Sequence, residues 1–219
     1  MIKITNAEVF GWDAAIRGMR NPMNSWDKSD SKHWRETIVG YDVEYRAVGR
    51  NDLTLMKKLV KAGSDHAKFM RMINVTADIT APLYWWKEFD TYKVGTVANS
   101  CSTMHTIASK EFTLDDFSHE HLTEDVIEKP FKTIIDCLNF FRELYIRDND
   151  KDDWWQLIQL LPTSYNQKRT VQLNYAVLRN MYHARRNHKL DEWRDFCSWV
   201  ESLPYAELIT LGGNDNGKD

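Results

Sequence analysis

Cysteine, glycine and proline are scarce in this chain of 219 residues, which contains 3, 9 and 5 of them respectively. The three cysteines, Cys101, Cys137 and Cys197, are odd in number and far apart in the sequence. They do not form a disulfide framework, so we expect a protein of the reducing cytoplasm. With 42% hydrophobic and 28% charged residues, the composition excludes a fibrous or disordered chain.

An excess of positive charge is also absent, because 29 lysines and arginines stand against 32 acidic residues. A protein that coats DNA or RNA needs a basic surface, so we expect no nucleic-acid partner, whereas a phosphorylated small molecule needs only a few local cations. No apolar run approaches the roughly 18 residues of a membrane span. The first residues lead directly into polar ones, so we expect neither a signal peptide nor a membrane partner.

Tryptophan, in contrast, is plentiful, with 9 residues. Tryptophan is costly to leave exposed, which predicts a large core, a cofactor cleft or a subunit interface. The pairs Trp85-Trp86 and Trp154-Trp155 suit a core or an oligomer interface better than a platform that stacks a nucleobase.

The hydrophobic pattern predicts a few strands and many helices. We expect strands over residues 2–9 and 70–79, and irregular loops over residues 20–34 and 106–130. We expect helices over residues 52–62, 82–92, 131–145, 153–161, 167–187 and 189–203. The fold class is therefore mixed α/β, a small sheet with a helical C-terminal half. A single domain is expected over residues 1–210, with a flexible tail over residues 211–219.

Motifs for metal binding and nucleophilic catalysis are missing. His119 and His121 stand in a polar loop without a second ligand pair at a recognised spacing, so we expect no metal site. Residues 148–153 lack the glycine and glutamate of a calcium loop, which makes a helix cap the better interpretation. The sequence contains no nucleophile elbow, no P-loop and no G-x-G-x-x-G motif.

Basic residues are more informative. The predicted helix over residues 167–187 carries Lys168, Arg169, Arg179, Arg185 and Arg186. Asn174, Leu178, Met181 and Arg185 recur at i, i+4, i+7 and i+11, which predicts one shared face. An amide can read the edge of a pyrimidine, and a guanidinium can hold a phosphate or a carbonyl oxygen. This face suits either the wall of a polar pocket or a half-buried helix with solvated ends.

A second pattern lies between Glu88 and Ser102. The triplet Thr91-Tyr92-Lys93 is followed by eight residues and then by Ser102. This arrangement resembles the signature of the flavin-dependent thymidylate synthases, which is Arg-His-Arg, seven or eight residues, and serine. Glu88 stands where the family often has glutamine, Thr96 where it has serine or threonine, and Asn99 where it has asparagine.

The C-terminal half continues the resemblance. Leu161-Pro162, Asn174, Asn180, Arg185 and Glu192-Trp193-Arg194 follow the order of the family and nearly its spacing. The helix expected after Asp52, and the turn that contains His66, stand where the family has a helix and a histidine-containing turn against the flavin. The resemblance covers about residues 50–200, as a pattern rather than as close identity.

This resemblance implies a mixed α/β homotetramer that holds FAD between subunits. The family transfers a one-carbon unit from methylenetetrahydrofolate to dUMP and reduces it with a hydride that reaches the flavin from NADPH. By this resemblance, Arg185 would be the catalytic residue that contacts and polarises the pyrimidine. Substrate contacts would come from Ser102, Glu88, Lys93 and Asn99. Cofactor contacts would come from Asn174, Asn180, His66, Thr91, Tyr92 and Thr96.

Several positions differ from the family's motif. Lys93 alone keeps a charge in the triplet, and Met104 and Ser100 stand where the family has arginine and glutamate. Because a charge-assisted hydrogen bond contributes roughly 1.5–3 kcal/mol, these changes weaken phosphate binding. Two alternatives to an enzyme therefore stay open. One is a nucleotide- or partner-binding protein on the same scaffold, and the other is a structural oligomer without a ligand.

Overall fold

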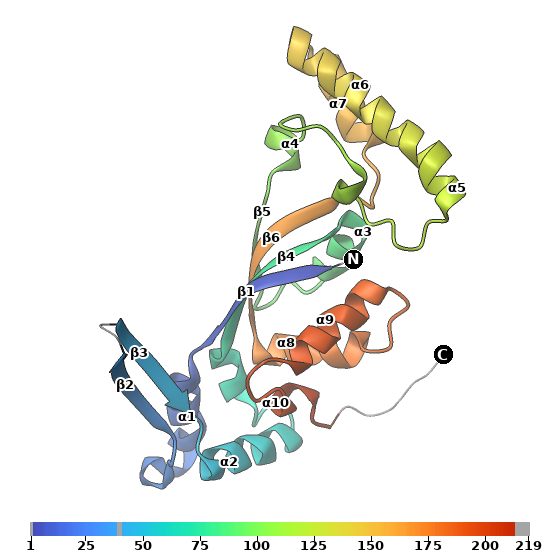
Figure 1. Cartoon of the computed structure of the whole chain (residues 1–219). Coiled ribbons are helices and arrows are strands. Elements are labelled where there is room, and N and C mark those ends of the chain that lie inside the picture. Colours follow the sequence, from blue (N-terminus) through green and yellow to red (C-terminus); the bar gives the residue numbers. More distant parts are fainter. Residues whose placement is uncertain (1, 39–40, 213–219) are drawn as a thin grey trace.

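The computed structural model describes residues 2–38 and 41–212, and its centre is a four-stranded antiparallel sheet (Figure 1). Across the sheet the strands are β1 (Lys3–Phe10), β4 (Asn74–Pro82), β6 (Asn166–Asn174) and β5 (Val97–Ser100). Strands β4 and β6 pair along their whole length, from Asn74 opposite Asn174 to Pro82 opposite Asn166. The sheet therefore joins segments from both halves of the chain.

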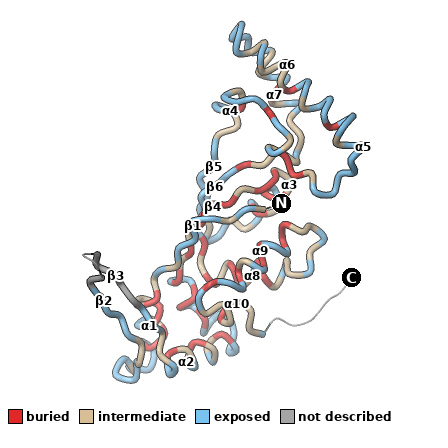
Figure 2. The backbone as a smooth tube through the Cα atoms, viewed as in Figure 1, coloured by how far each residue is buried: buried red, intermediate tan, exposed pale blue. Residues whose placement is uncertain are grey.

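One face of the sheet is apolar and carries the main core. In β4 the side chains of Val75, Ala77 and Ile79 are buried, whereas the alternating residues Thr76 and Asp78 are half-buried. This alternation is what a strand with one covered face requires. The same core includes apolar residues of α1 (Trp12–Arg20), α2 (Arg50–Lys61), α3 (Leu83–Phe89), α8 (Tyr175–Arg185) and α9 (Asp191–Glu201) (Figure 2).

Tryptophans occupy the middle of this core. Trp85, Trp86 and Trp193 have no exposed surface, and the ring centroids of Trp85 and Trp193 lie 4.8 Å apart. The pair Trp85-Trp86 thus lies in the core, as expected. The pair Trp154-Trp155 is not buried in this core, because Trp155 is 40% exposed on α7 (Lys151–Leu160).

The segment from α1 to α2, residues 12–61, lies at one end of the sheet (Figure 1). After α1 come two short turns, η1 (Asn21–Met23) and η2 (Trp26–Lys28), then a hairpin of β2 (Lys32–Ile38) and β3 (Tyr41–Ala47). The α2 helix follows. Arg20 Nε donates to Asp52 Oδ1 across 2.6 Å, and both side chains are buried. This pair fastens the end of α1 to the start of α2.

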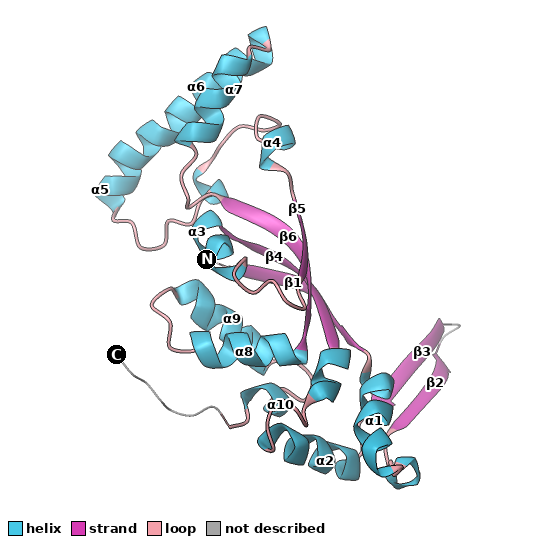
Figure 3. Cartoon of the chain, turned by 180° about the vertical axis from the view of Figure 1, so that it is seen from behind, coloured by secondary structure: helices cyan, strands magenta, loops and turns pink. Residues whose placement is uncertain are grey.

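At the other end, a helical hairpin of α6 (Lys132–Asp148) and α7 projects from the sheet (Figure 3). Three short elements precede it, α4 (Thr103–Thr106), η4 (Leu114–Asp116) and α5 (Glu124–Val126), and the π-helical segment η5 (Ile127–Phe131) leads into α6. A separate small core holds this region together. It contains Ile107, Phe112, Phe117, Phe131, Leu138 and Leu157. The remaining short elements are η3 (Lys68–Met72) and α10 (Glu207–Thr210).

The mixed α/β fold class is confirmed, and most predicted elements are present. The predicted strands correspond to β1 and β4, and Gly63 follows α2 with a φ of +107°, as the expected glycine after a helix. Asp150 caps α7 through Asp152 N, 2.9 Å away, so the acidic run over residues 148–153 is a cap.

One predicted helix is wrong in its first half. Residues 166–174 form β6, and the helix begins only at Tyr175. Val171 and Leu173 are buried while Lys168, Thr170 and Gln172 are exposed, which is the period of a strand. The sequence prediction also lacked α1, the β2–β3 hairpin and β5. The single domain over residues 1–210 stays a prediction, and residues 213–219 of the expected tail lie outside the described residues.

A membrane span was not expected from the sequence. Across residues 2–38 and 41–212, no helix has the length and apolar character needed to cross a membrane.

Candidate functional site

Three predicted site residues, two from one stretch of the sequence and one from a distant helix, meet at the end of α8. Arg185, the last residue of α8, donates from Nε to the Tyr92 hydroxyl across 3.0 Å. Its Nη1 donates to Glu88 Oε2 across 2.8 Å, and Glu88 belongs to α3. We call Glu88, Tyr92 and Arg185, together with Trp193 and His188, the Arg185 cluster.

Trp193 and His188 complete this cluster from the segment after α8. Trp193 Nε1 donates to Glu88 Oε2 across 2.9 Å, and the Arg185 guanidinium lies 4.9 Å from the centroid of the Trp193 ring. His188 Nε2 lies 3.4 Å from the same carboxylate oxygen. Sequence reasoning missed both as site residues. The position of His188 three residues beyond Arg185 was the available clue, since that spacing keeps side chains close at a helix end.

The electrostatics of the cluster are balanced. The guanidinium and the Glu88 carboxylate are 20% and 34% exposed, so they form a partly buried ion pair that is screened only in part by water. Stacking of the guanidinium on the rings of Trp193 and Tyr92 adds cation–π stabilisation. The arginine is therefore held firmly in one orientation, with its charge compensated by one carboxylate.

The triplet forms a turn that is fastened to its own backbone. The Thr91 hydroxyl donates to the Glu88 carbonyl across 2.7 Å, and the Thr96 hydroxyl donates to the Tyr92 carbonyl. Gly95 has a φ of +77°, and a Cβ atom there would lie 2.9 Å from Asn174 Nδ2. Glycine thus lets the turn approach the start of α8. The Lys93 side chain remains exposed.

The two asparagines expected on the cofactor side, Asn174 and Asn180, lie in different environments. Asn174 is the N-cap of α8, and its Oδ1 accepts a hydrogen bond from Val177 N across 3.0 Å. Asn180 is exposed. Leu178 and Met181, which lie between Asn174 and Arg185 on the predicted face, have no exposed surface. The prediction that this face forms the wall of a polar pocket is therefore wrong for its centre, which belongs to the core.

Ser102, Asn99 and His66 do not belong to the Arg185 cluster within one chain. Ser102 caps α4 by accepting from His105 N across 3.2 Å, and α4 lies toward the helical hairpin in both Figure 1 and Figure 3. Asn99 is exposed in β5 opposite Thr170. His66 is exposed in the turn after α2. In the described part of the chain, no hydrogen bond or ion pair joins these three to the cluster.

Two further cations, Arg169 and Lys168, are paired with carboxylates. Arg169 Nη1 lies 2.7 Å from Asp90 Oδ1, and its guanidinium stacks on Trp86 at 4.2 Å. Lys168 Nζ lies 2.9 Å from Asp78 Oδ2, and this hydrogen bond raises the pKa of Lys168. Both residues lie on β6 rather than on the predicted helix. Within the triplet Thr91-Tyr92-Lys93, the positive charge comes from the ammonium group of Lys93.

The two histidines of the polar loop bind protein groups. His119 Nδ1 lies 2.9 Å from the Phe117 carbonyl, and His121 Nε2 lies 2.9 Å from Asp191 Oδ2. Among the residues that the structure describes, no group of three or more metal-binding side chains is arranged to hold a metal ion.

The fold of this chain is similar to that of solved flavin-dependent thymidylate synthases. Thymidylate synthase X from Helicobacter pylori, solved with FAD and dUMP, is similar over 95% of this chain and 96% of its own, with a TM-score of 0.67 and 17% sequence identity. A second structure of the Helicobacter pylori enzyme, complexed with FAD and dUMP, gives 94% and 96% coverage, the same TM-score and 18% identity. No protein-family model and no curated protein sequence matches this chain. The fold is therefore shared over nearly the whole chain at low sequence identity.

Proposed function

We propose that this chain is a divergent, thymidylate-synthase-like enzyme that acts on a dUMP-like pyrimidine deoxynucleotide. The reaction would be one-carbon transfer and reduction with methylenetetrahydrofolate, FAD and NADPH. The observation that carries the proposal is the convergence of Arg185 with Glu88 and Tyr92, on a fold shared with enzymes solved with FAD and dUMP. In the proposal, Arg185 contacts the pyrimidine and stabilises negative charge that develops on a ring oxygen.

The remaining roles follow the sequence resemblance. Ser102, Lys93 and Asn99 would contact the nucleotide, and Glu88 would orient Arg185 and the base. Thr91, Tyr92, Thr96, Asn174, Asn180 and His66 would face the cofactor. Several of these side chains are exposed in one chain, namely Thr91, Lys93, Asn99, Asn180 and His66. Thr91 and Lys93 flank Tyr92, which contacts Arg185 in the same chain. A second subunit would have to complete the site with the other residues, which agrees with the homotetramer implied by the resemblance.

The flavin is the part of the proposal with the least support from the side chains. The diphosphate of FAD needs several charge-assisted donors. Lys93 is the one cation of the triplet, the hydroxyls of Thr91 and Thr96 already donate to backbone carbonyls, and Arg169 is paired with Asp90. These residues do not fit the diphosphate by themselves, so we derive no step that passes through the flavin.

This shortage of donors favours a second candidate, a nucleotide- or partner-binding protein on the same scaffold that has lost the flavin chemistry. The compensated charge of Arg185 supports it too, because the guanidinium is already bound to Glu88. A neutral cluster of this kind can still read a pyrimidine edge through hydrogen bonds.

The absorbance spectrum of the purified protein, followed by titration with FAD, separates the two candidates. Flavin absorbance or saturable FAD uptake supports the enzyme. Colourless protein that takes up no FAD, but that dUMP stabilises in a thermal shift, supports the binding protein. Arg185→Ala should abolish stabilisation by dUMP, whereas Arg147→Ala, which removes an exposed arginine of α6, should not. Absence of stabilisation by either ligand in the wild type would contradict both candidates.

A further inference from the structure

A groove lies between the loop over residues 118–122, the start of α9 and the junction of α5 with α6. It consists of two adjoining hollows of about 190 Å³ and 390 Å³, which share Glu120 and His121 as lining residues. None of Glu88, Tyr92 and Arg185 lines either hollow. The groove is therefore distinct from the Arg185 cluster.

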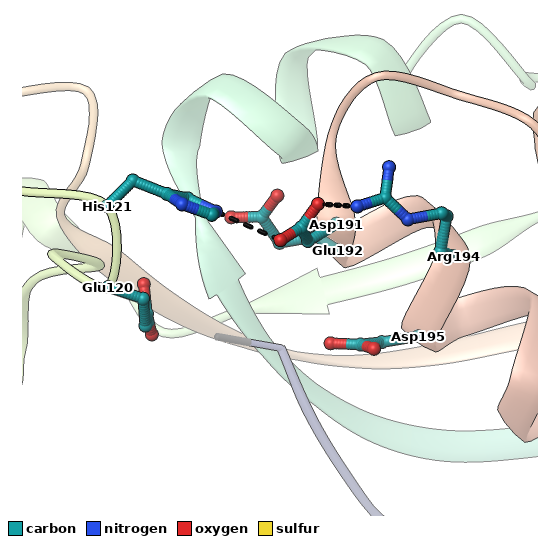
Figure 4. Close-up of a pocket in the computed structure, with 6 residues that line it drawn as sticks. All are labelled: Glu120, His121, Asp191, Glu192, Arg194 and Asp195. Carbon is teal, nitrogen blue, oxygen red and sulfur yellow. Dashed lines mark hydrogen bonds and ion pairs between the residues drawn. The ribbon is translucent and has the colours of Figure 1, made fainter.

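The smaller hollow is acidic (Figure 4). Its lining contains the carboxylates of Glu120, Asp191, Glu192 and Asp195, against the cationic side chain of Arg194 and the imidazole of His121. Both of these basic groups are bound to Asp191, Arg194 by a charged hydrogen bond and His121 across 2.9 Å. The end of the groove thus keeps a surplus of negative charge.

The carboxylates of Glu192 and Asp195 have different surroundings. Glu192 is 7% exposed and accepts a hydrogen bond from the Tyr84 hydroxyl, so a charged group is held almost buried at the wall of the hollow. Asp195 makes no ion pair within residues 2–38 and 41–212, and Figure 4 shows it among the residues that line the hollow, without an interaction to any of them. A buried carboxylate and an unpaired one both gain free energy when a cation approaches.

The larger hollow is mainly apolar. Its apolar lining is Leu122, Val126, Pro130, Phe131, Ile134 and Pro162. Leu122, Val126 and Ile134 are 36%, 37% and 38% exposed, although they are large apolar side chains. Covering such surface gains roughly 25 cal/mol for each Å² of apolar area removed from water.

The charged residues beside the apolar hollow are mostly negative, like those that line the acidic hollow. Glu124 and Asp125 of α5 and Glu128 of η5 flank the apolar hollow and are exposed, against Lys129. An anionic ligand such as a nucleotide or a phospholipid headgroup is repelled by this arrangement. The groove complements a segment that combines positive charge with apolar side chains.

We propose that this groove is a docking site for a peptide segment of a partner protein, in which arginine or lysine alternates with bulky apolar residues. The apolar side chains cover Leu122, Val126 and Ile134. A cationic side chain enters the acidic hollow beside Asp195 and Glu120. The proposal does not depend on nucleotide or flavin binding by the Arg185 cluster.

The test is fluorescence anisotropy of the full chain with a labelled decapeptide of alternating leucine and arginine. Two peptides serve as controls, one with glutamate in place of arginine and one with serine in place of leucine. The protein variants are Glu120→Gln combined with Asp195→Asn, and separately Val126→Ser. Glu143→Gln, which removes an exposed carboxylate from α6, is the matched control variant. Circular dichroism establishes that each variant is folded.

We expect saturable binding of the leucine–arginine peptide with one peptide per chain. Both groove variants should weaken it about fivefold or more, and added salt should weaken it further. The control variant should bind like the wild type, and neither control peptide should bind saturably. Equal binding of the serine–arginine peptide would overturn the proposal, because charge alone would then explain it. Absence of saturable binding at low salt, or binding unchanged in both groove variants, would overturn it as well.

Discussion

The guanidinium of Arg185 lies 2.8 Å from the carboxylate of Glu88, although 97 positions separate the two residues in the sequence. Trp193 donates to the same carboxylate oxygen, so this oxygen is shared between a cation and a neutral donor. The pair brings no net charge to the site. A ligand phosphate that approaches Arg185 therefore meets the Glu88 carboxylate too, and its attraction to the guanidinium is reduced.

Glu88→Gln should tighten the binding of dUMP by about threefold to tenfold, since it removes one negative charge beside Arg185 and keeps an oxygen acceptor. The measurement is isothermal titration calorimetry of wild type and variant with dUMP. Glu143→Gln provides the control, because it removes the same charge from an exposed position on α6. Equal or weaker affinity in Glu88→Gln would show that dUMP does not bind beside this carboxylate.

Asp52→Ala should destabilise the protein by about 3–5 kcal/mol, because it leaves the buried guanidinium of Arg20 without its carboxylate partner. Asp52 has no exposed surface, and its second oxygen accepts from the hydroxyls of Ser29 and Ser31 at 2.6 Å. The measurement is urea unfolding followed by circular dichroism. Asp148→Ala is the control, because its ion pair with Arg147 is exposed to solvent, so its loss should change the free energy of unfolding far less than the loss of Asp52. Similar losses in both variants would contradict the role given to burial.

The resemblance singles out Glu88, Tyr92 and Arg185 as site residues, but it does not predict that they contact one another. Trp193 and His188 join the cluster only through the turn after α8, which brings them back to α3. The hydrophobic periodicity of a sequence does not show where the chain turns back on an earlier helix. The turn after the triplet could not be predicted either. Glycine is required at position 95 because the Asn174 side chain packs against it, and this contact is known only from the fold.

The wrong helix assignment at β6 has a specific physical reason. Asn174, Leu178, Met181 and Arg185 fit a helical period, but Asn174 is the cap and the true helix starts one residue later. Before it, Thr170 and Val171 favour a strand, and β6 is completed by hydrogen bonding to β4 and β5 on its two sides. Because those partners are distant in sequence, local pattern alone could not decide between helix and strand.

Asp78 should make stability depend on pH in the acid range. Hydrogen bonds from Thr170, Lys168 and Asn6 lower its pKa from 3.8 to about 2. A carboxyl whose pKa is lower in the folded state adds stability that is present above its unfolded pKa and is lost as the pH falls from about 4 to about 2. Urea midpoints at neutral pH and across this range, for wild type and Asp78→Asn, provide the measurement. The variant should be less stable at neutral pH and should lose less stability on acidification. Parallel pH profiles of the two proteins would refute the assignment.

The last prediction concerns assembly. Lys93, Asn99 and Asn180 are exposed. Ser102 caps α4, which lies toward the helical hairpin, whereas Arg185 ends α8 at a different place in the fold (Figure 1). If these residues form one nucleotide site, chains must associate so that Ser102 of one subunit approaches Arg185 of another. Light scattering should then give the mass of a tetramer, and dilution that dissociates the assembly should abolish stabilisation by dUMP while each chain stays folded. A monomer that still binds dUMP would contradict the shared site and would leave the Arg185 cluster as a binding site complete within one chain.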